Sequence, residues 1–226
     1  NVAVGAYTHR YATGSYNTFV GYKAGTGGTT SAPYASGENN VAMGYQALTA
    51  FTTGATNVAV GAYSLDAVTT GTANVGIGYY AGSSITDGFQ NIVIGENAGD
   101  TMTSTRYTVL IGHAAGTDIN STDANGTIAI GYNAGANITS GRYNTAIGYN
   151  ALDAEDDGDG NTAVGYNALT AQTGTSGTVG NTAVGYGAGQ SITTAVQNNA
   201  LGYTALANTT TGGANTGIGY EAGKFN

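Results

Sequence analysis

The sequence lacks several residue types on which common protein classes depend. It has no cysteine, no tryptophan, one proline and two histidines in 226 residues. Without cysteine there is no disulfide framework, and the isolated His9 and His113 offer a transition metal too few ligands. Only 8% of the residues are charged, against about a quarter in ordinary proteins. No apolar run approaches the roughly 20 residues that cross a bilayer, so we expect no membrane insertion in this segment.

Basic residues are scarce, and this bears on partners and chemistry. The chain has 13 acidic and five basic residues, a net charge of −8. No basic stripe exists to neutralise phosphates, so we expect no nucleic-acid partner. The scattered acids Asp66, Asp87, Asp100 and Asp118 form no recognisable pairing of nucleophile, base or catalytic carboxylates. We therefore predict that the chain is not an enzyme, and we predict no catalytic, cofactor-binding or metal site and no cofactor.

What the sequence does have is one phrase, Asn-(Thr/Val)-Ala-(Val/Ile)-Gly-Tyr-x-Ala, which recurs 13 times. The commonest interval between its glycines is 17 residues. A unit this short cannot bury its own apolar face, so successive units must stack as coils. The anchor glycines are Gly5, Gly21, Gly44, Gly61, Gly78, Gly95, Gly112, Gly131, Gly148, Gly165, Gly185, Gly202 and Gly219.

The phrase is typical of a β-strand with two distinct faces. Its fourth position is apolar in every copy, and in 11 of 13 copies it is β-branched, which suits a half-buried pleated surface. The second position shares that face, because side chains alternate along a strand. The third position is alanine in eight copies and the fifth is always glycine. We expect this bare alanine and glycine row to face outward and to be hidden by a neighbouring chain.

A weaker second strand and tight turns complete the expected coil. Seventeen residues suffice for two strands of about five residues each and two connections. The sequence thus predicts an all-β fold, a parallel β-solenoid of 13 coils with about 17 residues and two short strands per coil. We expect one repeat domain over residues 1–226, as a segment of a longer fibrous chain. Three longer intervals predict loops at 25–39, 117–126 and 170–180.

The repeat, as in Asn144-Thr145-Ala146-Ile147-Gly148-Tyr149-Asn150-Ala151-Leu152, resembles the head repeats of trimeric autotransporter adhesins, the YadA-like left-handed parallel β-roll. It is also similar to the Asn-Thr-Ala-Ile-Gly-Tyr arrays of phage and bacterial tail-fibre proteins. The resemblance covers the whole chain and implies a left-handed roll, three parallel chains and a role in adhesion or receptor contact. The adhesin repeat is somewhat shorter, and no anchor, stalk or chaperone segment lies in this sequence.

Two polar or aromatic columns each allow a structural and a functional interpretation. Asparagine opens 11 of 13 phrases, and we expect a stacked amide ladder rather than an array that faces a ligand. Tyrosine follows the anchor glycine in nine copies, where it either packs at the corner of the coil or stacks on sugar rings. Where alanine takes that place, Tyr7 and Tyr63 follow at once, as if each corner requires a ring. We expect packing.

The acidic stretch at 153–159 is the remaining candidate ion site. Carboxylate oxygens suit Ca²⁺, but the stretch lacks the ligand order and the terminal glutamate of a helix-loop-helix calcium site. Four acids in five positions, 153–157, are more typical of a solvated edge.

Three functions compete. The first is an extracellular fibre segment, a homotrimer or higher homo-oligomer on a virion tail or a bacterial surface. It contacts a receptor or cell-surface glycan through loops near 31–39, 117–125 and 171–179. The second is a structural filament whose segments join end to end without a specific receptor. The third is ice binding on a flat face. We rank it last, because we expect the threonines to lie in turns and at buried second positions.

Overall fold

The computed structural model describes residues 1–28, 34–120, 124–173 and 177–225. Every regular element within those ranges is a strand, which confirms the all-β prediction. No helix of this part of the chain is long and apolar enough to cross a membrane. Internal contacts divide the chain into two units, Asn1–Thr108 and Val109–Asn226. Both carry the same repeat, and the single domain expected over residues 1–226 stays a prediction.

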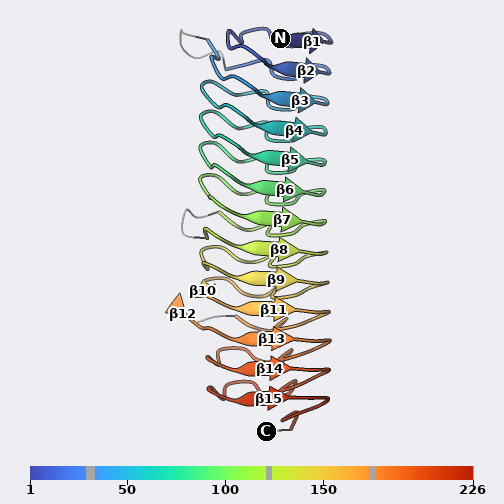
Figure 1. Ribbon diagram of the computed structural model, residues 1–226, viewed down its shortest axis with the longest axis vertical. Coiled ribbons are helices and arrows are strands. Elements are labelled where there is room, and N and C mark those ends of the chain that lie inside the picture. Colours follow the sequence, from blue (N-terminus) through green and yellow to red (C-terminus); the bar gives the residue numbers. More distant parts are fainter. Residues whose placement is uncertain (29–33, 121–123, 174–176, 226) are drawn as a thin grey trace. The chain divides into compact units, whose positions relative to one another are not determined.

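Each coil contributes one three-residue strand, and strands of successive coils lie side by side within a unit (Figure 1). In the first unit these strands are β1 (Val2–Val4), β2 (Thr18–Val20), β3 (Val41–Met43), β4 (Val58–Val60), β5 (Val75–Ile77) and β6 (Ile92–Ile94). In the second unit they are β7 (Val109–Ile111), β8 (Ile128–Ile130), β9 (Thr145–Ile147), β11 (Thr162–Val164), β13 (Thr182–Val184), β14 (Asn199–Leu201) and β15 (Thr216–Ile218).

The pairing register follows the repeat. Neighbouring strands are parallel, and each residue faces the residue at the same repeat position one coil further on, as in Val58↔Val75 and Val60↔Ile77. The same holds in the second unit, where Thr145 pairs with Thr162. This arrangement confirms a parallel β-solenoid with about 17 residues per coil and short strands.

The inward face of the strand is the opposite of the one expected. The third-position side chains are fully buried from β2 to β14, for example Ala59 and Ala146. The second and fourth positions, most of them β-branched, are half-exposed or exposed; Ile77 is 37% exposed, and the unbranched Met43 and Leu201 are 45% and 48% exposed. The alanine row is therefore hidden by the chain's own coil and not by a neighbouring chain. The interior is narrow, and larger side chains from the rest of the coil already fill it.

Those larger side chains stand four and seven residues after the anchor glycine. The fully buried set includes Leu48, Phe51, Leu65, Val68, Ile85, Met102, Ile119, Ile138, Leu152, Leu169 and Ile192. The third-position residue, small in most coils, lies inside with one or two of these larger side chains. Close packing of this kind leaves no room for two β-branched rows pointing inward.

A size limit shared by two positions supports this account of the interior. Where the third position is large, the residue six places later is glycine, as in the pairs Phe19/Gly25 and Leu110/Gly116. A Cβ on Gly25 would lie 2.4 Å from the Phe19 ring, and one on Gly116 would lie 2.8 Å from Leu110. The two positions therefore share the same interior space.

The anchor glycine is required by the approach of two backbones. At Gly148 φ is +138°, and a Cβ there would lie 2.3 Å from the carbonyl oxygen of Gly165 in the next coil. Real Cβ atoms do not come this close to backbone, so only glycine fits. The backbone that approaches the anchor glycines belongs to the same chain and not to the neighbouring chain that the sequence predicts.

The second limb of the coil is regular strand in few places. Among the described residues it forms only the two-residue strands β10 (Gly158–Asp159) and β12 (Gly177–Thr178), which pair in parallel, and an isolated bridge between Phe89 and Arg106. In several other coils two or three N–H groups converge on one carbonyl. The amides of Thr69, Thr70 and Gly71 all donate to the Thr86 oxygen, at 2.8–3.2 Å. Such convergence prevents the evenly spaced bonds of a parallel ladder.

The asparagine column forms the predicted ladder. The Oδ1 of Asn57 accepts hydrogen bonds from the N and Nδ2 of Asn74, at 3.0 and 3.2 Å. The Nδ2 of Asn74 also donates to the Gly88 carbonyl at 2.8 Å, which ties the strand to the turn of the next coil. Most of these amides are fully buried, so the ladder replaces water for them.

Candidate interaction surfaces

The outer face, defined as the second- and fourth-position side chains of the three-residue strands, is a candidate surface of each unit. It carries no charged residue at any of its positions, although the chain has a net charge of −8. In the first unit both columns are almost entirely aliphatic, and Met43 and Ile77 are exposed. In the second unit the fourth position stays aliphatic, while threonine takes the second position at Thr145, Thr162, Thr182 and Thr216.

Aromatic rings line the corner that follows each strand of the second unit. His113 stacks on Tyr132 with ring centroids 5.1 Å apart and planes 8° apart. The same spacing, 4.9–5.3 Å, continues coil by coil along one column. His113, which takes the tyrosine position of its coil, is therefore the first ring of this stack. The column comprises His113, Tyr132, Tyr149, Tyr166, Tyr186, Tyr203 and Tyr220.

The stacking favours packing over sugar binding for the tyrosine column. Within the column each ring face is covered by the next ring, which leaves edges and hydroxyl groups at the surface. In the first unit Tyr63, which stands one place late, meets Tyr45 edge to face at 5.3 Å. Tyr7 meets Tyr22 in the same way at 5.7 Å. The prediction that each such corner recruits a ring is confirmed at both places.

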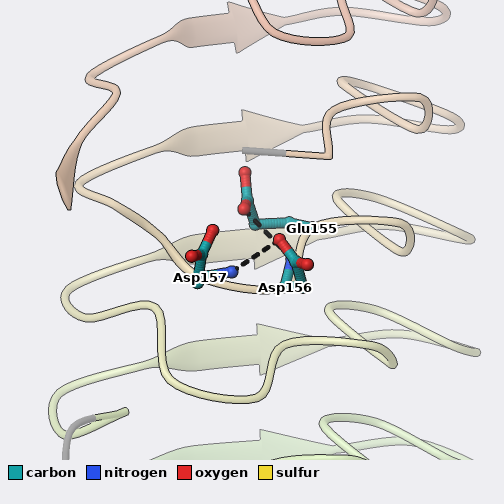
Figure 2. A group of neighbouring side chains, drawn as sticks. All are labelled: Glu155, Asp156 and Asp157. Atoms are coloured by element: carbon teal, nitrogen blue, oxygen red, sulfur yellow. Dashed lines mark hydrogen bonds between the residues drawn. The ribbon is translucent and has the colours of Figure 1, made fainter. Parts of the chain in front are cut away.

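The acidic stretch, whose neighbours Glu155, Asp156 and Asp157 are drawn in Figure 2, is not simply a solvated edge, because Glu155 is fully buried. Its Oε1 accepts hydrogen bonds from the backbone N–H groups of Asp156 and Gly158, at 3.0 and 2.8 Å. Its Oε2 accepts one from Asn161 Nδ2 at 3.2 Å. Burial raises the pKa of Glu155, and the backbone hydrogen bonds offset part of that rise.

The position of Glu155 in the repeat indicates that it is a residue of the coil interior. It stands seven residues after Gly148, the position that Ile138 and Ile192 occupy in their own coils. There its carboxylate engages the asparagine ladder through Asn161. Glu155, Asp156 and Asp157 bring carboxylate oxygens within 4.8 Å of one another, an arrangement that a cation could use. The hydrogen bonds that Glu155 already makes account for its position in the cluster without a bound cation.

The other residues considered for chemistry lie in structural surroundings. Burial lowers the pKa of His9, whose ring centroid lies 5.7 Å from that of Phe19. Burial raises the pKa of Asp66 to about 6. A hydrogen bond from the Ser104 hydroxyl is the main cause that lowers the pKa of Asp87. The long loops are described only outside 29–33, 121–123 and 174–176, so three of the nine residues in each predicted contact segment lie outside the described residues.

Comparison with protein-family models, with curated proteins and with solved structures found no match. The resemblance to adhesin heads and tail-fibre arrays therefore stays a prediction drawn from the repeat phrase.

Proposed function

We propose that this chain is a structural fibre segment whose outer face is covered by other copies of the same chain in a homotrimer, outside the cell on a virion tail or bacterial surface. The proposal gives the assembled fibre a role in attachment to a receptor. The resemblance of the repeat supports both the trimer and the setting. The alanine row no longer supports a neighbouring chain, since the coil itself buries that row.

The exposed aliphatic columns are the observation that carries the proposal. Outward side chains such as Met43, Ile77 and Leu201 recur at one place in coil after coil. An apolar strip of this kind marks an interaction site in soluble proteins. A second copy suits it, because every copy repeats the same columns with the same coil spacing, and because the strip holds no charge on an acidic chain. Two such faces meet without opposing like charges.

Light scattering at several protein concentrations tests the assembly. We expect a molar mass of about three times 22.4 kDa. The double variant Met43→Lys/Ile77→Lys places two positive charges on the outer face and should shift the mass toward that of one chain. The matched control Thr53→Lys/Thr70→Lys adds the same charge at exposed turn positions of the same unit and should leave the mass unchanged. A monomeric parent chain, or a control that dissociates equally, contradicts the proposal.

The filament alternative makes a different prediction for the same sample. If the segments join end to end, the mass rises with concentration without a limit, and electron microscopy shows open polymers. Closed particles of one size favour the trimer.

Ice binding gains one specific observation. The second-position threonines point outward, contrary to the expectation that they are buried, and Thr182 and Thr216 are exposed beside an aliphatic column. Asn199 interrupts the series, and Val109 and Ile128 replace threonine at its start. Thermal hysteresis in a freezing assay that is lost in Thr162→Lys but kept in Thr70→Lys would favour this function; absence of hysteresis excludes it.

A further inference from the structure

An open cleft of about 490 Å³ in the first unit gathers positive charge. Of its 11 lining residues two are basic and none is acidic. The whole chain has five basic and 13 acidic residues, so two of its few cations lie at one hollow. A cleft lined by one sign of charge concentrates ligands of the opposite sign.

The two cations are held beside aromatic rings. The guanidinium carbon of Arg10 lies 5.3 Å from the centroid of the Tyr7 ring and 5.1 Å from that of Tyr11. The Nζ of Lys23 lies 5.5 Å from the Tyr22 ring centroid. In the described part of the chain neither cation forms an ion pair with a carboxylate. Ring contacts thus restrain both side chains, while their donors stay available to an anion.

Threonine hydroxyls supply the complementary acceptors. The hydroxyl of Thr52 donates to the carbonyl of Thr69 at 3.0 Å, and that of Thr69 donates to the carbonyl of Thr86 at 3.1 Å. Because each hydroxyl proton is already donated to a backbone carbonyl, the lone pairs of these oxygens are what they offer to a ligand, as hydrogen-bond acceptors. The same bonds fix the side chains, which reduces the entropy lost on binding.

We propose that this cleft binds an acidic saccharide, a sugar that carries a carboxylate or a sulfate. The anionic group pairs with Arg10 and Lys23, a ring edge of the sugar packs on the exposed phenol of Tyr7, and sugar hydroxyls donate to the threonine oxygens. A neutral sugar has no anionic group to pair with the two cations, and an inorganic anion has no sugar ring to pack on Tyr7, so both should bind more weakly than an acidic saccharide. The inference rests on the attachment role proposed above and names its ligand class, but it requires no oligomer.

Calorimetric titration of the whole chain tests the ligand class with four probes. These are a heparin-derived hexasaccharide, a hexamer of galacturonate, maltohexaose and inorganic sulfate, at equal ionic strength. We expect the two acidic saccharides to bind at least about 10-fold more tightly than the other two. Equal affinity for maltohexaose refutes the anionic preference. Equal affinity for inorganic sulfate means that the cleft holds an ion only, and failure of both acidic saccharides overturns the proposal.

Charge-removing variants locate the site. Arg10→Gln and Lys23→Gln should each weaken binding by about 10- to 100-fold, the usual contribution of a charge-assisted hydrogen bond. The matched control Arg106→Gln removes an arginine that also lies over a ring, 4.6 Å from Phe89, outside the cleft, and should leave the affinity unchanged. Equal weakening in the control contradicts the assignment.

Two further measurements keep the outcome unambiguous. Circular dichroism shows whether each variant is folded, and if Arg10→Gln fails to fold, Lys23→Gln carries the test. Molar mass is measured on the same samples. An intact oligomer that does not bind the saccharide refutes the cleft proposal alone. A monomer that still binds the saccharide refutes the homotrimer proposal alone.

Discussion

Truncating one rung of the asparagine ladder is the sharpest test of what stabilises each unit. In Asn74→Ala the chain loses an amide whose Oδ1 accepts from Asn91 N and Nδ2, at 3.2 and 3.0 Å. The same amide donates to Asn57 Oδ1 at 3.2 Å and to the Gly88 carbonyl at 2.8 Å. Asn91 Nδ2 keeps its bond to the Thr105 carbonyl, but the Asn91 N–H loses its acceptor inside the coil.

The magnitude follows from the groups left without a partner. Two buried backbone groups, the Asn91 N–H and the Gly88 carbonyl, lose a partner at about 1–3 kcal/mol each. We therefore expect Asn74→Ala to lower the free energy of unfolding by about 2–6 kcal/mol, a large fraction of the stability of a typical domain. Asn215→Ala is the matched control. Asn215 is part-exposed, and water can replace its bonds, so we expect a loss below about 1 kcal/mol.

Urea unfolding followed by circular dichroism gives the two free energies, and hydrogen exchange of the Asn91 amide reports the local effect. Because coils stabilise their neighbours, exchange should accelerate most in the coils that flank the substitution. If Asn74→Ala costs no more than Asn215→Ala, or if the Asn91 amide keeps its protection, the ladder is not a principal source of stability.

Three shorter predictions address single residues. Gly148→Ala should lower the free energy of unfolding by more than about 3 kcal/mol, because its Cβ would meet the Gly165 carbonyl. The control Gly160→Ala also has positive φ but open space around it, so it should cost about 1 kcal/mol. Comparable losses of the two variants in urea unfolding would rule out the backbone contact as the cause. Burial raises the pKa of Asp66 from 3.8 to about 6, so the folded chain binds this proton more tightly than the unfolded chain. The free energy of unfolding should therefore fall as pH rises through that window. Asp66→Asn should flatten this part of the pH profile, and an unchanged slope in the variant would contradict the assignment to Asp66. Calcium at about 1 mM, where weak extracellular sites bind, should leave the unfolding temperature unchanged, since Glu155 is already engaged by backbone N–H groups; a rise that Asp156→Asn abolishes would establish a cation site.

Much of the fold could be predicted from the repeat, and the reason is physical. Fixed spacing sets the number and size of coils, and a buried amide repeated at one position has few partners other than its own copies. The ladder through Asn57 and Asn74, and the recruitment of Tyr63 to a corner that lacks its usual tyrosine, follow from that logic.

The direction of the strand faces could not be read from alternation. A period of two tells which residues share a face, but it does not tell which face is inside. Propensity favours the β-branched row for the core, whereas the volume of the core decides which row lies inside. The sequence signal that identifies the inner row is the glycine six places after each large third-position residue, as in Leu110 and Gly116, because a side chain at the glycine position would occupy the space of the larger residue.

Glu155 and the second limb were missed for related reasons. A charged residue in an acidic stretch suggests solvent, yet its distance from Gly148 places it in the core column, where backbone N–H groups satisfy it. The second limb has strand-like residues, but convergence of hydrogen bonds on the Thr86 carbonyl depends on the local path of the chain, which composition does not encode.

Thiol labelling tests the central claim most directly, because the chain has no cysteine of its own. Ala42→Cys and Met43→Cys place single thiols on adjacent residues, one 0% and one 45% exposed in a single chain. The exposed turn variant Thr53→Cys sets the rate of an open thiol. The account predicts that Ala42→Cys stays unreactive throughout, while Met43→Cys is protected in concentrated samples and reacts as fast as Thr53→Cys after dilution to single chains. A reactive Ala42→Cys, or a Met43→Cys that reacts freely at every concentration, contradicts it.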